Sequence, residues 1–321
     1  MKNIINLIVK DEDKVQRVDV FIKNKEDSLS RTRIKNLILK KKLTLNNVVL
    51  EDPSKKVTPG DILKLEIPEP IKTTLNPYNY KLDIIYEDDD LLVINKSAGI
   101  SMHPGAGNYD NTIVNALMNY CGGNLSTIGD ELRPGIVHRI DKETSGLLII
   151  ARTYKSSVYL SKKFKDKNIE KFYLAILNGI PKKTNGIIIS KIKDKKNKDA
   201  VTKYIVLKKI KKRFSFVLLK PETGRKRQIR EHCFVLGCPI LGDKKYFKKL
   251  EQNKNIDSNK LFLHAYKLKI IKKDGIKEEF TASLPDHIRK FCYLYKIPIN
   301  ETFINKFVIS NILKGAKELK N

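Results

Sequence analysis

The chain has 321 residues, and its 64 Lys and Arg against 36 Asp and Glu give a formal net charge of +28 at pH 7. This length allows one large domain with a smaller one, and the excess of positive charge favours a partner rich in phosphates. No apolar run approaches the roughly 20 residues of a membrane span, and the first 14 residues lack the continuous apolar core of a signal peptide. The abundance of Lys, Asn and Ile offers a second explanation of the charge, which is an AT-biased coding sequence.

The four cysteines form no Cys-x-x-Cys pair. The gap between Cys233 and Cys238 fits no common zinc pattern. We therefore expect reduced thiols in a cytoplasmic protein.

The first part of the chain predicts two helices followed by a small sheet. Apolar residues recur at helix spacing between residues 15 and 42, and Ser30 is suited to cap the second helix. Short strands are expected at 43–45, 48–50 and 62–67. Three prolines within 68–80 indicate a linker, because proline disfavours the continuation of a helix or a central strand.

The second of these helices carries several Arg and Lys side chains, so the unit is suited to grip phosphates. The segment Arg17-Val18-Asp19 and the stretch from Leu29 to Asp61 resemble the RNA-binding domain named after ribosomal protein S-four. The other interpretation is a solvated basic helix on an unrelated small domain.

The rest of the chain predicts more strands than helices. A hairpin is expected at 82–86 and 91–95. The remaining strands are expected at 135–137, 147–151, 173–177, 204–207, 214–219 and 268–271, and the helices at 112–120, 156–164, 227–236 and 286–295. Because these elements do not alternate regularly, we predict an α+β fold with a mixed, mainly antiparallel sheet and flanking helices.

We accordingly divide the chain into three parts. Residues 1–75 form a small α/β RNA-binding domain with its linker, and residues 76–295 form a catalytic domain. Residues 296–321 form a tail in which one amphipathic helix is expected.

Two polar segments are candidates for chemistry. In residues 133–150, two apolar runs enclose a polar loop, and a loop held by a sheet fixes its side chains in place. This loop nominates His138, Arg139 and Asp141. Residues 221–232 lead from a strand through a glycine turn into a helix, and their cations suit a phosphate or a buried carboxylate.

These segments resemble the motifs of the RluA family of pseudouridine synthases. The resemblance rests on His138-Arg139-Ile140-Asp141, where the family usually has leucine in third place, and on Thr144-Ser145-Gly146. Arg227 stands where the family usually has histidine. The blocks 82–96 and 103–108 resemble the RluD-like branch that acts on large-subunit ribosomal RNA, whose members usually carry the S-four type domain.

The resemblance implies the pseudouridine synthase fold and an enzyme that isomerises specific uridines in large-subunit (23S) ribosomal RNA, without metal or cofactor. Asp141 is then the catalytic aspartate, Tyr173 the active-site tyrosine and Arg230 the charge partner of the aspartate. Arg139 and Ile229 would contact the substrate.

The implied partner is large-subunit ribosomal RNA or its assembly intermediate. No membrane and no small-molecule cofactor are expected as partners, and the protein is expected to be a cytoplasmic monomer.

The reaction explains why these residue types are useful. The bond from the ring nitrogen to the sugar must break, the base must turn, and carbon 5 must take the place of the nitrogen. A carboxylate can serve as nucleophile, as base at the neighbouring sugar carbon, or as electrostatic support, and the sequence leaves these three open. A guanidinium partner keeps a buried carboxylate ionised. The tyrosine offers stacking worth ~1–3 kcal/mol to a base that has left its helix, and a hydroxyl that can assist proton removal from carbon 5.

Each residue also has an ordinary structural interpretation. Asp141 alone could be a turn or N-cap residue, His138 is more typical of a structural hydrogen bond, Tyr173 of a strand and Arg230 of a helix surface.

Two other functions remain. A non-catalytic RNA-binding or ribosome-assembly factor would explain the charge but not the motifs. A metal-dependent phosphodiesterase could use His103, His138, Asp141 and His264, although their spacing fits no ligand motif.

Overall fold

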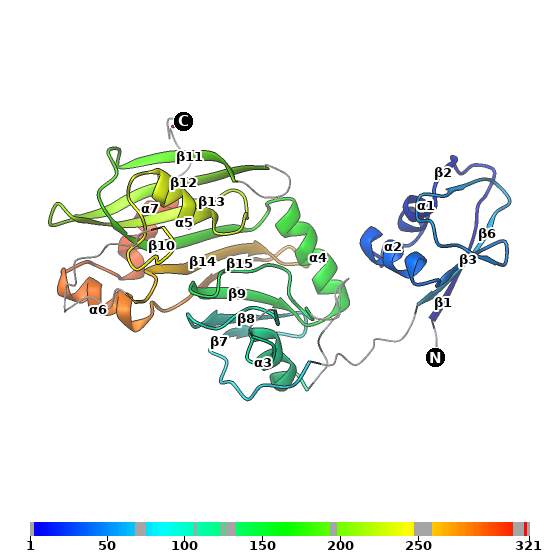
Figure 1. Ribbon diagram of the computed structural model, residues 1–321, viewed down its shortest axis with the longest axis horizontal. Coiled ribbons are helices and arrows are strands. Elements are labelled where there is room, and N and C mark those ends of the chain that lie inside the picture. Colours follow the sequence, from blue (N-terminus) through cyan, green and yellow to red (C-terminus); the bar gives the residue numbers. More distant parts are fainter. Residues whose placement is uncertain are drawn as a thin grey trace.

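The computed structural model describes residues 3–67, 75–105, 108–122, 125, 133–192, 198–246, 259–310 and 318–319. Figure 1 shows a small N-terminal domain beside a larger domain built on one long sheet. Among the described residues, no helix is both long and apolar enough to cross a lipid bilayer.

The N-terminal domain packs two helices on a four-stranded sheet of order β1-β6-β3-β4. Its elements are β1 (Asn3–Ile8), β2 (Gln16–Arg17), α1 (Val18–Lys25), α2 (Arg31–Leu39), β3 (Leu43–Leu45), β4 (Val48–Val49), β5 (Lys56–Val57) and β6 (Ile62–Ile67). The two predicted helices and the strands are confirmed, and the Ser30 hydroxyl accepts from the Arg33 N–H as the expected cap. β1 was not predicted. It pairs antiparallel with β6 along its whole length.

A buried carboxylate joins the two helices of this domain. Asp19 is 2% exposed and accepts hydrogen bonds from Arg17 Nε at 3.0 Å and from Arg31 Nε at 2.9 Å. Burial raises the pKa of Asp19, but the two guanidinium groups outweigh burial and lower that pKa below its usual value. Arg17 and Arg31 therefore stabilise this domain as well as adding to its positive charge.

The large domain contains a ten-stranded sheet in which nine strands follow the order β16-β11-β12-β13-β10-β14-β9-β8-β7, with β15 paired to β14. Its strands are β7 (Ile84–Glu87), β8 (Leu91–Lys96), β9 (Ser145–Ala151), β10 (Glu170–Asn178), β11 (Asn185–Ile192), β12 (Lys198–Ile210), β13 (Phe214–Pro221), β14 (Leu263–Ile271), β15 (Lys277–Thr281) and β16 (Glu318–Leu319). The β9–β14 and β11–β16 pairs are parallel and the other pairs are antiparallel. The predicted mixed, mainly antiparallel sheet is confirmed.

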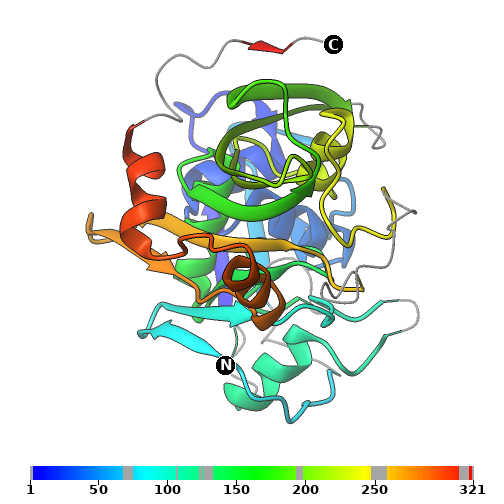
Figure 2. The same cartoon turned by 90° about the vertical axis from the view of Figure 1, so that its left-hand side faces the viewer.

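Five helices among the described residues pack on this sheet. They are α3 (Ile113–Tyr120), α4 (Tyr154–Lys165), α5 (Gln228–Val235), α6 (Asp286–Leu294) and α7 (Glu301–Ser310). α3 packs on β8 and β9, whereas α5, α6 and α7 share a core with β10, β12 and β13. In Figure 2, α6 and α7 lie in front of the sheet and the N-terminal domain lies behind it.

One predicted strand is absent. Residues 135–137 form a turn with a single bridge from Ile136 to Ile150. Gly135 has a φ of 70°, which an extended strand does not allow, and the Ala151 N–H donates to its carbonyl. An apolar run was therefore mistaken for a strand.

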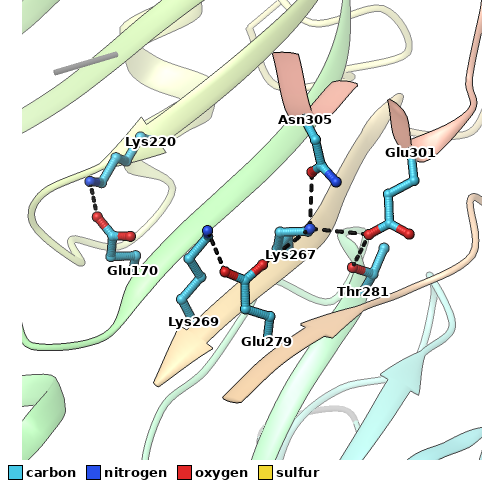
Figure 3. Close-up of polar contacts among 8 residues, drawn as sticks. All are labelled: Glu170, Lys220, Lys267, Lys269, Glu279, Thr281, Glu301 and Asn305. Carbon is cyan, nitrogen blue, oxygen red and sulfur yellow. Dashed lines mark hydrogen bonds and ion pairs between the residues drawn. The ribbon is translucent and has the colours of Figure 1, made fainter. Parts of the chain in front are cut away.

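The predicted tail helix is α7, and a buried lysine anchors it to the sheet (Figure 3). Lys267 on β14 has a side chain only 3% exposed, and its Nζ lies 3.1 Å from Glu301 Oε1, 3.0 Å from Asn305 Oδ1 and 3.4 Å from Glu279 Oε2. The Thr281 hydroxyl also donates to Glu301. Ile304 on the same helix is fully buried in the core of the large domain. α7 is therefore packed as part of that domain.

Two fully buried histidines give the fold a defined response to acid. Burial lowers the pKa of both His232 and His264 to about 4. The unfolded chain takes up these protons near pH 6.5, so between the two values the unfolded state binds more protons than the folded state. We expect the free energy of unfolding to fall from pH 6.5 to 5 by up to about 1.4 kcal/mol per pH unit for each ring.

Urea unfolding at pH 7, 6 and 5 would measure this slope. His264→Gln should remove the contribution of one histidine ring to this slope. An unchanged slope in that variant would contradict the assignment.

Candidate active site

A cleft of about 710 Å³ opens beside the polar loop of residues 137–144. The end of α4, the start of β10 and the segment 220–230 form its other walls. Cationic side chains dominate its polar lining, namely Arg139, Lys165, Lys167, Lys171, Lys220, Arg225, Lys226, Arg227 and Arg230. A cleft of this charge suits a polyanion.

Asp141 lies in the loop that leads into β9, with 20% of its side chain exposed to the cleft. The loop joins the sheet at Gly146, which has a φ of 112°. A Cβ there would lie 2.3 Å from the Ala265 carbonyl oxygen, because β9 and β14 pair in parallel at this point. Glycine is therefore required for the close contact between these strands. That contact fixes where the loop that carries Asp141, here called the aspartate loop, ends.

Lys96, at the end of β8, holds the same loop from behind. Lys96 is only 1% exposed. Its Nζ donates to the carbonyls of Ser97 at 2.8 Å, Ile100 at 3.0 Å and Lys142 at 3.1 Å. Burial lowers the pKa of Lys96 to about 7, while the charges of Glu143 and Asp141 oppose that shift. Lys96 thus fixes the backbone next to Asp141.

His138 has the structural role that its residue type suggested. Its Nε2 accepts the Ile149 N–H at 2.9 Å, and its ring stacks on Phe164 at 4.4 Å. Burial lowers the pKa of His138 to about 3, so the ring is neutral near pH 7. The nitrogen that accepts from the backbone is therefore not available as a general base.

Tyr173 projects from β10 beside a register shift in the pairing with β14. It is half-buried and packs against two apolar cores. One lies between α3 and strands β8 and β9 (the α3-side core), and the other is shared by α5 with β10, β12 and β13 (the α5-side core). Burial raises the pKa of Tyr173 above its ordinary value, and the nearby charge of Asp141 adds to that rise. The phenol therefore keeps its proton at neutral pH.

Arg230 of α5 connects two carboxylates. Its Nη1 lies 3.5 Å from Asp141 Oδ2, as the sequence led us to expect. Much closer contacts join Nε to Asp243 Oδ2 at 2.7 Å and Nη2 to Asp243 Oδ1 at 2.8 Å. Burial of Arg230 lowers its pKa, but the hydrogen bonds and charge of Asp243, aided by Asp141, outweigh burial and raise it. The guanidinium is therefore charged.

The start of α5 is fixed by an amide network. Gln228 is 3% exposed, and its Nε2 donates to the Val201 carbonyl and the Thr202 hydroxyl. Its Oε1 accepts from the Thr223 hydroxyl and the Arg225 N–H. These contacts tie the helix to β12, so Arg230 two residues later projects from a fixed position.

The comparisons with known proteins agree with this geometry. Residues 90–234 match the family described as RNA pseudouridylate synthase, and residues 16–63 match the S4 domain. "Ribosomal large subunit pseudouridine synthase D" of Zymomonas mobilis is 36% identical over 85% of this chain and 92% of its own length. The protein of the same name from Borreliella burgdorferi is 35% identical over 86% and 87%.

The chain belongs to the RNA pseudouridylate synthase family. It is an isomerase that converts uridine in RNA to pseudouridine, and it carries an RNA-binding S4 domain. The solved structure of human RNA pseudouridylate synthase domain containing 4 shares the fold, with a TM-score of 0.54 and 24% identity over 67% of this chain and 93% of that chain. The family resemblance in the motifs is confirmed, and the alternative of a non-catalytic RNA-binding factor is set aside.

The remaining expected site residues of the synthase also line the cleft. Arg139 is exposed at its edge, whereas Ile229 is 7% exposed and packs in the α5-side core. Arg227, where the family usually has histidine, is the N-cap of α5 and has a left-handed backbone with φ of 59°. That conformation is uncommon for a residue with a side chain, and it turns the preceding loop into the helix.

The metal-site alternative finds no support in the part of the chain that the structure describes. No group of three or more His, Cys, Asp or Glu residues there could hold a metal ion. His138 accepts a backbone N–H, and His264 Nδ1 lies 2.9 Å from the Ser145 hydroxyl.

Sequence reasoning missed Asp243 and did not single out Lys96. The signal for Lys96 was a cation at the end of a buried apolar run, which requires acceptors inside the protein. The signal for Asp243 was weaker, because an acidic residue after Leu241-Gly242 is also typical of a surface turn.

Proposed function

We propose that this pseudouridine synthase acts on large-subunit ribosomal RNA and that Asp141 is its catalytic carboxylate. The names of the Zymomonas and Borreliella relatives support the substrate. The observation that carries the assignment of the site is the contact of Asp141 with the charged Arg230 inside a cationic cleft that also contains Tyr173. This arrangement supplies a carboxylate beside a cation, an aromatic face and a surface for phosphates.

The proposed reaction begins with a uridine that has left its stack and entered the cleft. Asp141 then acts at the sugar while the bond from ring nitrogen to the anomeric carbon breaks. As nucleophile, as base at the neighbouring carbon or as electrostatic support, it must be ionised in each route. Arg230 places a positive charge beside this carboxylate.

The base turns in the cleft, carbon 5 joins the anomeric carbon, the proton on carbon 5 is released to water, and the freed ring nitrogen takes up a proton. Tyr173 supports the base through its ring, an interaction worth ~1–3 kcal/mol. Because its phenol stays protonated, it acts as a wall and hydrogen-bonding group rather than as a phenolate base. Arg139, exposed at the edge, contacts the RNA beside the extruded nucleotide, and Ile229 packs beside the base.

The division near residue 75 into an RNA-binding domain and a catalytic domain belongs to the same proposal, whereas the expected boundary at residue 295 separates no domain, because α7 packs into the core of the large domain. The S4 domain holds the RNA and the large domain carries out the chemistry. A cytoplasmic location follows from the proposed ribosomal substrate.

Release of tritium from RNA labelled at carbon 5 of uridine tests this function. We expect the purified protein to release tritium to water from a large-subunit transcript, to a limit set by a few uridines per molecule. A small-subunit transcript of similar length serves as the control. Equal release from both RNAs would contradict the proposed substrate, and no release from any uridine-containing RNA would contradict the catalytic assignment.

A further inference from the structure

We propose that Asp243 is a positioning residue for the isomerisation, which fixes the guanidinium of Arg230 so that one nitrogen faces Asp141. This inference rests on the proposed function, because it concerns how Asp141 is kept competent. It assigns a role to a residue outside the His138–Asp141 motif and outside α5.

The geometry of the Arg230 side chain carries the first step. Asp243 accepts from Nε at 2.7 Å and from Nη2 at 2.8 Å, which is a side-on, two-point contact. Such a contact fixes the plane of a guanidinium as well as its position. The remaining nitrogen, Nη1, is the one that lies 3.5 Å from Asp141. Asp243 therefore determines which edge of Arg230 the catalytic carboxylate meets.

The segment that leads to Asp243 is fixed to the strand that carries Tyr173. Leu241 N–H donates to the Ile176 carbonyl on β10, and Phe262 N–H donates to the Leu241 carbonyl. The Asp243 side chain is fully buried, and its Oδ1 also accepts from the N–H groups of Lys245 and Tyr246 at 3.0 and 3.3 Å. Four donated hydrogen bonds hold this carboxylate rigid. Arg230 is thereby held against the central sheet as well as on its own helix.

The division of contacts also affects the reactivity of Asp141. A two-point pair between Arg230 and Asp141 would occupy both carboxylate oxygens. The side-on contact with Asp243 limits Arg230 to a single long contact with Asp141 Oδ2. Asp141 thus gains a nearby positive charge without a two-point pair that would occupy both of its oxygens.

Asp243→Asn tests the proposal, because asparagine has the same shape but would place an N–H opposite one of the guanidinium N–H groups. We expect the single-turnover rate of tritium release to fall about tenfold to a hundredfold. RNA affinity, measured by filter binding, should stay within twofold of the wild type. This separates a positioning role from a loss of RNA binding.

Glu301→Gln is the control for the loss of a carboxylate that pairs with a buried cation, although Glu301 itself is largely exposed. Glu301 contacts the buried Lys267 (Figure 3), and neither residue is among those that line the cleft, so this variant should lose some stability but keep the wild-type rate. A rate for Asp243→Asn within twofold of the wild type, in folded protein, would overturn the proposal. Failure of the proposed function would look different, since the wild type itself would then release no tritium.

A second comparison covers the case in which Asp243→Asn does not fold. Arg230→Gln and the double variant Arg230→Gln/Asp243→Asn are compared in single turnovers followed for many hours, because the double variant leaves no fully buried carboxylate without its cation. If Asp243 acts through Arg230, the double variant will be no slower than Arg230→Gln. A further tenfold fall in the double variant would show that Asp243 acts independently of Arg230 and would overturn the proposal.

Discussion

Asp141→Asn should release tritium from RNA labelled at carbon 5 at least roughly 10⁴-fold more slowly than the wild type, which is the scale of loss when a central catalytic group is removed. An amide is neither a nucleophile nor a base under these conditions, and it brings no negative charge to the sugar. The three chemical roles open to Asp141 therefore predict the same outcome. Single-turnover release with saturating enzyme measures it.

The variant should remain folded and bind RNA. The Asp141 side chain is 20% exposed, and Arg230 keeps its closer partner Asp243, so no buried charge is left alone. Glu143→Gln is the matched control, since Glu143 is an exposed carboxylate in the same loop. It should keep a rate close to that of the wild type. Release by Asp141→Asn within tenfold of the wild type would refute the assignment.

The aspartate loop was predictable from the sequence because its signals are local. Apolar runs on both sides of residues 138–146 indicate a loop held between buried segments, and the motif lies inside that loop. The structure adds a contact that cannot be read from the local sequence. Gly146 is needed because β14, more than a hundred residues later, packs against its backbone.

Tyr173 and Arg230 came from the family resemblance rather than from their own surroundings. Each lies in a different element, on β10 and on α5, and only the fold brings them to one cleft. Asp243 could not be found in this way, because its partner lies 13 residues away across a turn. Burial of a carboxylate is a property of the packed structure, and Leu241-Gly242-Asp243 is equally compatible with an exposed turn.

The same limit explains the errors in the fold. Residues 135–137 are apolar like a strand, but a left-handed glycine turns the chain there. β1, β11 and β15 were not predicted, because a strand at or near the edge of a sheet, or a short one, buries only part of its surface, so its apolar alternation is incomplete. Whether these segments form strands depends on the neighbouring strands with which they pair.

Arg230→Gln combines a loss of stability with a loss of rate. Removing the guanidinium leaves Asp243 buried with only the backbone N–H groups of Lys245 and Tyr246, and an unpaired buried charge typically costs ~3–5 kcal/mol. Asp141 also loses the nearby cation. We expect the free energy of unfolding to fall by that amount and tritium release to slow by about 10²-fold, the scale of one lost electrostatic contact.

Urea unfolding and single-turnover release would separate these two effects. In Arg230→Gln/Asp243→Asn no fully buried charge is left unpaired, so much of the stability should return, because a buried pair replaced on both sides is often nearly neutral. The rate should not return, since Asp141 still lacks its cation. Recovery of the rate together with the stability would mean that Arg230 serves the fold alone. Recovery of stability alone would show that the cation acts on the catalytic carboxylate.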